Sequence, residues 1–190
     1  KYFALIRNLQ RFGWLVPYLF GASPAICKSF LAGKQTTLQA FNENTYYSPH
    51  ATSLRMCDIG YQNSLENEVG FKASYDNLDT YVSSLGRAIE TPSSRFEEIG
   101  VKVDGSYRQL NANMLQIENE YYSSVRPKQV PEVNEKPTLA LRRRGVRYVE
   151  LRSLDINIFD PQGISETQCR FIETFMAFCL LHDSPVISPQ

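Results

Sequence analysis

Three segments of the chain carry apolar residues at helical spacing. The stripe in the first segment consists of Tyr2, Leu5, Ile6 and Leu9. This stripe predicts an amphipathic helix that breaks before Pro17. A second helix is predicted over 76–91, because Pro92 stops the helical pattern there. The third predicted helix begins at Ser165, which forms a capping-box pair with Gln168.

Two other stretches alternate between polar and apolar residues, as strands do. In the stretch 147–155, one face carries Tyr148, Glu150 and Arg152, whereas Val149 and Leu151 lie on the opposite face. A second strand is predicted over 114–122, and its polar face carries Gln116, Glu118, Glu120 and Tyr122. Pairing of the two strands would gather acids, an arginine and a tyrosine on one polar surface. The alternative is a plain solvent-facing sheet, which is the more common from the pattern alone.

Turn residues define the remaining elements. Asp104-Gly105 supplies the two positive-φ positions of a two-residue hairpin turn, so we expect a hairpin there. A short helix is predicted from Ser93 or Ser94 to Gly100, and residues 35–53 read as a long, irregular loop. Strands and helices mixed without a βαβ rhythm predict an α+β fold.

The composition limits both the domain organisation and the partners. The chain has 190 residues, which is the length of one domain, so we expect residues 1–190 to form part of one catalytic domain without an internal boundary. It opens on Lys1 and reads as a segment of a larger protein. A formal net charge of zero gives no overall field for nucleic acid or an anionic membrane.

Two further features bear on the cellular compartment. Arg7 and Arg11 interrupt the first apolar segment, so we expect a core helix there and no membrane anchor. The four cysteines, Cys27, Cys57, Cys169 and Cys179, are scattered without a C-x-x-C pair. This pattern is typical of reduced thiols, and we expect a cytoplasmic protein.

The strand 147–155 is the main candidate for chemistry. On one strand face the carboxylate of Glu150 and the guanidinium of Arg152 would lie roughly 6 to 7 Å apart. Such a pair suits a metal–phosphate site, because magnesium prefers carboxylate oxygen and a planar guanidinium binds phosphoryl oxygens with two hydrogen bonds. The alternative is a cross-strand ion pair on a solvated sheet face, and from the Glu-x-Arg pattern alone this alternative is the more common.

Other polar clusters point less clearly to a function. Arg126, Lys128 and the run 142–144 lie in the predicted connection between the two strands, where they could contact an anion or RNA. The chain has no GxGxxG, Walker or RNA-recognition motif, so we favour a solvated surface. His50 and His182 do not have a metal-ligand spacing, and no cysteine has a nearby histidine to activate it.

Four motifs, taken together, resemble the proteobacterial glutamate–cysteine ligase family. They are residues 11–25 (RFGWLVPYLFGASPA), 51–55 (ATSLR), 115–120 (LQIENE) and 148–157 (YVELRSLDIN). The motifs occur in the order of the family and with similar spacing along nearly the whole chain. The joint match is specific, although each motif alone is not.

The resemblance implies a fold similar to the catalytic domain of glutamine synthetase, in which a curved, mainly antiparallel sheet with flanking helices forms a funnel. It also implies a two-step reaction with ATP and Mg²⁺. The γ-carboxylate of L-glutamate takes the γ-phosphoryl group of ATP, and the amine of L-cysteine then displaces phosphate. This is the first step of glutathione biosynthesis.

The resemblance further suggests roles for five residues. Glu150 matches a magnesium ligand, and Arg152 matches the arginine that steadies the phosphoryl group. Arg55 matches a second active-site arginine, directed at phosphate or a substrate carboxylate. Tyr61 and Tyr122 match tyrosines that line the cysteine pocket.

One departure from the family pattern concerns the start of the chain. The first metal-binding carboxylates of the family, and much of its glutamate pocket, belong to a segment that would precede Lys1. We therefore expect the 190 residues alone to be inactive. The alternatives to a stand-alone ligase are the ligase half of a bifunctional glutathione synthase and an unrelated anion-binding or RNA-binding module.

Overall fold

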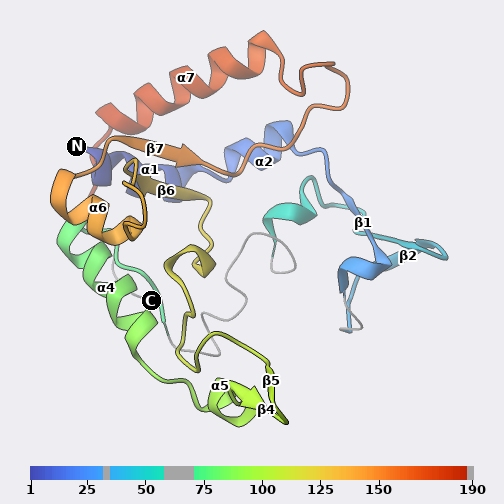
Figure 1. The fold of residues 1–190 in the computed structure, drawn as a ribbon. Helices are drawn as coiled ribbons and strands as arrows, with labels where there is room; N and C mark the ends of the chain where they lie inside the picture. The colour runs from blue at the N-terminus through green and yellow to red at the C-terminus, as the bar shows by residue number, and fades with distance from the viewer. Residues whose placement is uncertain (32–34, 58–70, 188–190) are drawn as a thin grey trace.

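The computed structural model describes residues 1–31, 35–57 and 71–187. Within these residues the strands form three small antiparallel sheets of three, two and two strands rather than one curved sheet. Helices pack around the pair β6–β7, whereas the sheet containing β1 and β2 and the hairpin β4–β5 project away from it (Figure 1). The expected α+β class is therefore confirmed.

The elements have the following bounds. The α-helices are α1 (Tyr2–Phe12), α2 (Leu15–Phe20), α4 (Leu78–Glu90), α5 (Ser94–Ile99), α6 (Pro137–Arg144) and α7 (Glu166–Leu181). The strands are β1 (Ala25–Cys27), β2 (Gln39–Asn42), β3 (Thr45–Tyr47), β4 (Lys102–Val103), β5 (Ser106–Tyr107), β6 (Val125–Lys128) and β7 (Tyr148–Leu151). Short 3₁₀ helices are η1 (Lys28–Leu31), η2 (Leu54–Met56) and η3 (Glu118–Glu120).

The helices predicted from capping and stop signals are confirmed. Asn77 caps α4 in a capping box with Thr80, and α4 ends two residues before Pro92. Ser165 caps α7 and accepts a hydrogen bond from the Gln168 N–H. These signals are local, because each cap satisfies backbone groups within its own first turn.

The first predicted helix forms and ends before Pro17. Helix α1 ends at Phe12, and a separate helix that was not predicted, α2, begins after Gly13-Trp14. Pro17 lies inside the first turn of α2. A proline is tolerated there, because the N–H groups of a first turn have no partner within the helix.

The hairpin at Asp104-Gly105 forms as predicted. Both residues have positive φ, 50° and 81°, and they join β4 to β5. In contrast, the expectation of a long irregular loop over 35–53 is wrong, since β2 and β3 pair there. The Asn42 side chain accepts a hydrogen bond from the Asn44 N–H at 2.9 Å and stabilises the turn between these strands.

The strand predicted over 114–122 is also absent. Side chains take up backbone groups of this segment, since the Gln116 N–H donates to Glu120 and the Asn111 side chain donates to the Gln116 carbonyl. Such bonds compete with a sheet ladder. Only the turn η3 forms, and the strand that pairs with β7 is β6, further along the chain.

The hydrophobic core holds β6–β7 in place from one side. Helix α1 contributes Leu5, Ile6 and Leu9, and it contacts α7, β6 and β7. Val125 of β6 is completely buried in this core. One face of the β6–β7 pair is therefore packed against the core, and the side chains of the opposite face point away from these core residues.

Candidate functional site

The strands β6 and β7 carry most of the predicted site. They pair antiparallel, with Arg126 opposite Glu150 and Pro127 opposite Val149. Val149 and Leu151 pack against the hydrophobic core. Because successive side chains of a strand point to opposite faces, Glu150 lies on the face away from the core.

Arg152 lies just beyond β7 and continues its pairing. The Arg152 N–H donates to the Ser124 carbonyl at 2.8 Å, so the alternation of side chains extends to this position. Glu150 and Arg152 therefore share one face, as the sequence predicted. We call the face that carries Arg126, Lys128, Glu150 and Arg152 the polar face.

The polar face has a surplus of positive charge. Lys128 Nζ lies 3.8 Å from Glu150 Oε2, and these side chains are 29% and 38% exposed. Arg126 is only 7% exposed, and its Nη2 donates to the Glu118 carbonyl at 3.4 Å. Such a face suits a ligand with several anionic oxygens.

Tyr122 and Arg152 come together across the turn that precedes β6. The guanidinium carbon of Arg152 lies 5.6 Å from the centroid of the Tyr122 ring, within the range of a cation–π contact. Tyr122 remains 41% exposed. The structure thus brings three of the five predicted site residues, Tyr122, Glu150 and Arg152, to one region.

Arg55 approaches this region through Asp155. Its Nε donates to Asp155 Oδ1 at 2.7 Å, and its Nη2 donates to the Leu154 carbonyl at 2.7 Å. Asp155 also accepts hydrogen bonds from the Ala22 N–H and the Ser23 hydroxyl. The segment that follows Arg152 therefore anchors Arg55.

The pKa of Asp155 reflects its surroundings. Burial alone would raise the pKa of this carboxyl group. Hydrogen bonds from the Ala22 N–H, Arg55 and Ser23 outweigh burial, so the pKa lies below its ordinary value. Asp155 is therefore a charged, buried anchor, which the sequence pattern did not single out.

The backbone at Gly21, after the end of α2, lies close to the backbone at Thr52. A Cβ atom at Gly21 would lie 2.6 Å from the Thr52 carbonyl oxygen, so only glycine fits there. Beyond Gly21, the Ser23 N–H donates to the Thr52 carbonyl and the Leu54 N–H donates to the Ser23 carbonyl. These contacts hold the turn η2, which contains Arg55, beside the end of α2.

Glu118 and Glu120 do not join the polar face as predicted. Glu118 is 6% exposed, and its carboxylate accepts hydrogen bonds from the Thr138 N–H and hydroxyl at the start of α6. Glu120 accepts a hydrogen bond from the Gln116 N–H. Glu118 therefore binds a free N–H group at the start of α6, and Glu120 binds an N–H group of its own segment.

The residues of the polar face fit part of a magnesium site. Among the described residues, no group of three or more His, Cys, Asp or Glu side chains could enclose a metal ion. Magnesium is nevertheless held in many proteins by one or two carboxylates together with substrate phosphates and water. Glu150 supplies one partly exposed carboxylate of this kind, with cations for phosphate beside it.

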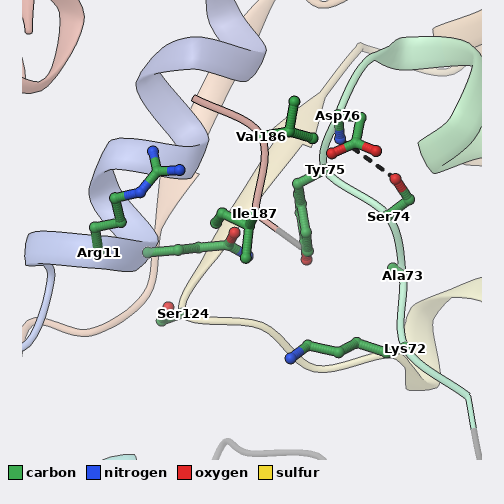
Figure 2. Close-up of a pocket in the computed structure, with 10 residues that line it drawn as sticks. Arg11, Lys72, Ala73, Ser74, Tyr75, Asp76, Ser124, Val186 and Ile187 are labelled. Atoms are coloured by element: carbon green, nitrogen blue, oxygen red, sulfur yellow. Dashed lines mark hydrogen bonds between the residues drawn. The ribbon is translucent and has the colours of Figure 1, made fainter. Parts of the chain in front are cut away.

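A separate pocket lies beside α1. It has a volume of about 710 Å³ and lies between α1, residues 72–76 and the segment that contains Val186 (Figure 2). Ser124 lines it, but none of the five predicted site residues does. The Arg11 guanidinium at its wall donates to Asn8 and to the Pro185 carbonyl, so it is engaged in packing.

Three other predictions have the following outcomes. Tyr61 lies outside the described residues. Arg126 and Lys128, predicted to lie in a connection, belong to β6, and the proline between them concealed this short strand. No helix in the described ranges has the length and hydropathy to cross a membrane.

Comparisons with known proteins identify the family of the chain. The family model for glutamate-cysteine ligase matches residues 1–190. The glutamate–cysteine ligase of Alcanivorax borkumensis is 54% identical over an alignment of 190 residues, and the match covers 97% of this chain and 36% of that protein. The enzyme of the same name from Pseudomonas paraeruginosa is 52% identical over 189 residues and covers 100% of this chain and 36% of its own length.

A solved structure has a similar fold. The crystal structure of glutamate–cysteine ligase from Francisella tularensis, in complex with AMP, matches with a TM-score of 0.87 at 40% identity. The match covers 98% of this chain and 37% of that protein. The chain thus spans a little over a third of the length of its relatives, and it belongs to the glutamate-cysteine ligase family.

Proposed function

We propose that the protein containing this chain joins the γ-carboxylate of L-glutamate to the amine of L-cysteine, with ATP and Mg²⁺. The observation that carries this proposal is the family match over all 190 residues. The names of the relatives favour the single-activity ligase over a fused bifunctional enzyme. A cytoplasmic location is part of the same proposal.

The chemistry explains why a nucleotide is needed. A carboxylate is a poor electrophile, and transfer of the γ-phosphoryl group to one of its oxygens creates an acyl phosphate with a good leaving group. The amine of cysteine then attacks the acyl carbon, and inorganic phosphate leaves with the electron pair of the broken C–O bond. The Francisella relative, which contains AMP, supports nucleotide use in the family.

The polar face supplies residues for these steps. We propose that Glu150 holds Mg²⁺, which when bound would neutralise phosphate charge. Arg152 would orient the phosphoryl group through its planar guanidinium. Arg55, held by Asp155 at 2.7 Å, would bind phosphate or a substrate carboxylate.

The tyrosines complete the proposed site. Tyr122 would bound the cysteine pocket beside Arg152, since its ring is partly exposed and lies 5.6 Å from that guanidinium. Tyr61 is proposed for the same pocket on the basis of the resemblance alone. We also propose that β6–β7 belongs to a larger curved sheet of a glutamine-synthetase-like domain, and that residues 1–190 are the central part of this one domain.

A coupled assay of ADP release tests the proposal. The full-length protein that contains this segment should release ADP only when glutamate, cysteine, ATP and magnesium are all present. The isolated chain should be inactive, because it spans only a little over a third of the length of its relatives. Cysteine-dependent ADP release by the isolated chain would contradict the expectation that residues 1–190 lack part of the active site. If the full-length protein showed no cysteine-dependent ADP release, the proposed function would be contradicted.

A further inference from the structure

We propose that Lys128 alternates between two partners on the polar face. Without metal, its ammonium group pairs with the Glu150 carboxylate. When a divalent cation occupies Glu150, the ammonium group binds the polyphosphate of the nucleotide. This inference rests on the proposed function and deepens it by adding Lys128 to the nucleotide site.

The geometry of the pair allows this exchange. The distance of 3.8 Å between Lys128 Nζ and Glu150 Oε2 is longer than a charge-assisted hydrogen bond. Both side chains are partly exposed, so water screens their attraction and the pair contributes little to stability. The ammonium group can therefore leave Glu150 at small cost.

The other cations of the face are held more firmly. Arg126 is nearly buried beside Glu118 and directly opposite Glu150. The guanidinium of Arg152 lies over the Tyr122 ring. Lysine differs from both, because it carries a compact charge on a flexible four-carbon stem. Lys128 is therefore the cation of this face that is best able to move.

The charges also require a second partner for Lys128. Arg126, Lys128 and Arg152 outnumber the carboxylate of Glu150 on this face. Even with the Glu118 carboxylate, which lines the same cavity as Arg126 and Lys128, an excess of one positive charge remains. A divalent cation on Glu150 increases this excess and repels the nearby ammonium group. A polyphosphate chain is the ligand class that neutralises such a cluster, because it presents many anionic oxygens.

The proposal predicts effects of opposite sign for one substitution. Lys128→Met removes the charge and keeps the length of the side chain. Metal should then bind Glu150 more tightly, because no ammonium group competes for the carboxylate. The nucleotide should bind more weakly, because a phosphate contact is lost. If Lys128 had a purely structural role, the substitution would lower the affinity for both the metal and the nucleotide.

The experiment uses the full-length ligase that contains this segment, with Mn²⁺ as the metal probe. Free Mn²⁺ is measured by electron paramagnetic resonance without nucleotide, and the KM values for ATP and cysteine are measured separately. Lys128→Met should bind Mn²⁺ roughly three- to fivefold more tightly. Its KM for ATP should rise about tenfold, while the KM for cysteine stays unchanged.

Two matched variants complete the design. Lys128→Arg keeps the charge and should retain most of the affinity for ATP. Lys102→Met removes a lysine from the β4–β5 hairpin and should change neither the affinity for Mn²⁺ nor the KM for ATP. Unchanged or weaker Mn²⁺ binding by Lys128→Met, or an equal rise of both KM values, would overturn the proposal. A wild-type protein without cysteine-dependent ADP release would instead refute the ligase function itself.

Discussion

Arg55 and Asp155, which are 100 residues apart in the sequence, form an ion pair with 2.7 Å between Nε and Oδ1. The carboxylate of Asp155 is almost fully buried, whereas the Arg55 side chain is 30% exposed. The pair joins the 3₁₀ turn after β3 to the segment after β7. Each of the two proposed active-site arginines, Arg55 and Arg152, is therefore tied to the same short stretch of chain.

The first prediction concerns this ion pair. Asp155→Asn should lower the free energy of unfolding by about 1 to 3 kcal/mol, because the buried hydrogen bonds lose their charged acceptor. Urea denaturation of the chain measures this loss. Asp183→Asn, at an exposed position, is the matched control and should change stability little.

The same residue predicts a pH dependence. The folded-state pKa of Asp155 lies below its value in the unfolded chain, so its contribution to stability is complete above the unfolded value. This contribution is lost as the pH falls below about 4 toward the folded pKa. Wild type should therefore approach the stability of Asp155→Asn in acid. A constant difference between the two proteins from pH 7 to pH 2 would contradict the assignment.

The second prediction concerns Arg152 in the full-length ligase. Arg152→Ala should lower kcat by roughly 100-fold or more and leave the KM for cysteine nearly unchanged, because phosphoryl charge develops most in the transition state. Arg152→Lys should recover only part of the rate, since an ammonium group lacks the planar fork of a guanidinium. Normal turnover with weaker cysteine binding would assign Arg152 to the amino-acid pocket instead.

The third prediction concerns Glu150. Glu150→Gln should raise the magnesium concentration needed for half-maximal activity by about tenfold, because a neutral amide is a weaker ligand for a hard cation. A magnesium titration at saturating ATP measures this shift. Glu98→Gln, at an exposed position of α5, serves as the control. An unaltered titration curve for Glu150→Gln would remove this residue from the metal site.

The fourth prediction separates two cysteines. The Ser29 hydroxyl, 3.1 Å from the sulfur, lowers the pKa of the exposed Cys27, whereas burial raises the pKa of Cys179 to about 11. Because the thiolate is the reactive form, Cys27 should react with iodoacetamide at pH 8 roughly tenfold faster or more. Mass spectrometry of the labelled peptides measures both rates. Equal labelling of the native chain would contradict the burial of Cys179.

The sequence predicted elements whose signals are local. The cap at Ser165, the helix stop at Pro92 and the turn at Asp104-Gly105 depend on residues within a few positions of one another, so the pattern contains all that is needed. The polar face of β7 was predicted for the same reason. Its alternation of side chains follows from strand geometry alone.

The sequence did not predict contacts between distant segments. The partner of Glu118 is Thr138, 20 residues away, and this contact draws the acid into the interior instead of onto a sheet face. The pairing of β6 with β7, and hence the place of Lys128 beside Glu150, depends on tertiary packing in the same way. Single-sequence periodicity contains no signal for such pairs.

Pro127 determines at which edge the β6–β7 pair can bind an additional strand. Because the Arg152 N–H bonds the Ser124 carbonyl and bonded positions alternate along an antiparallel pair, the nitrogen of Pro127 points to the free edge of β6. An added strand would find no N–H donor at this position. Any wider sheet in the whole protein is therefore expected to extend from the edge of β7, and the edge of β6 is protected against unwanted strand addition and aggregation.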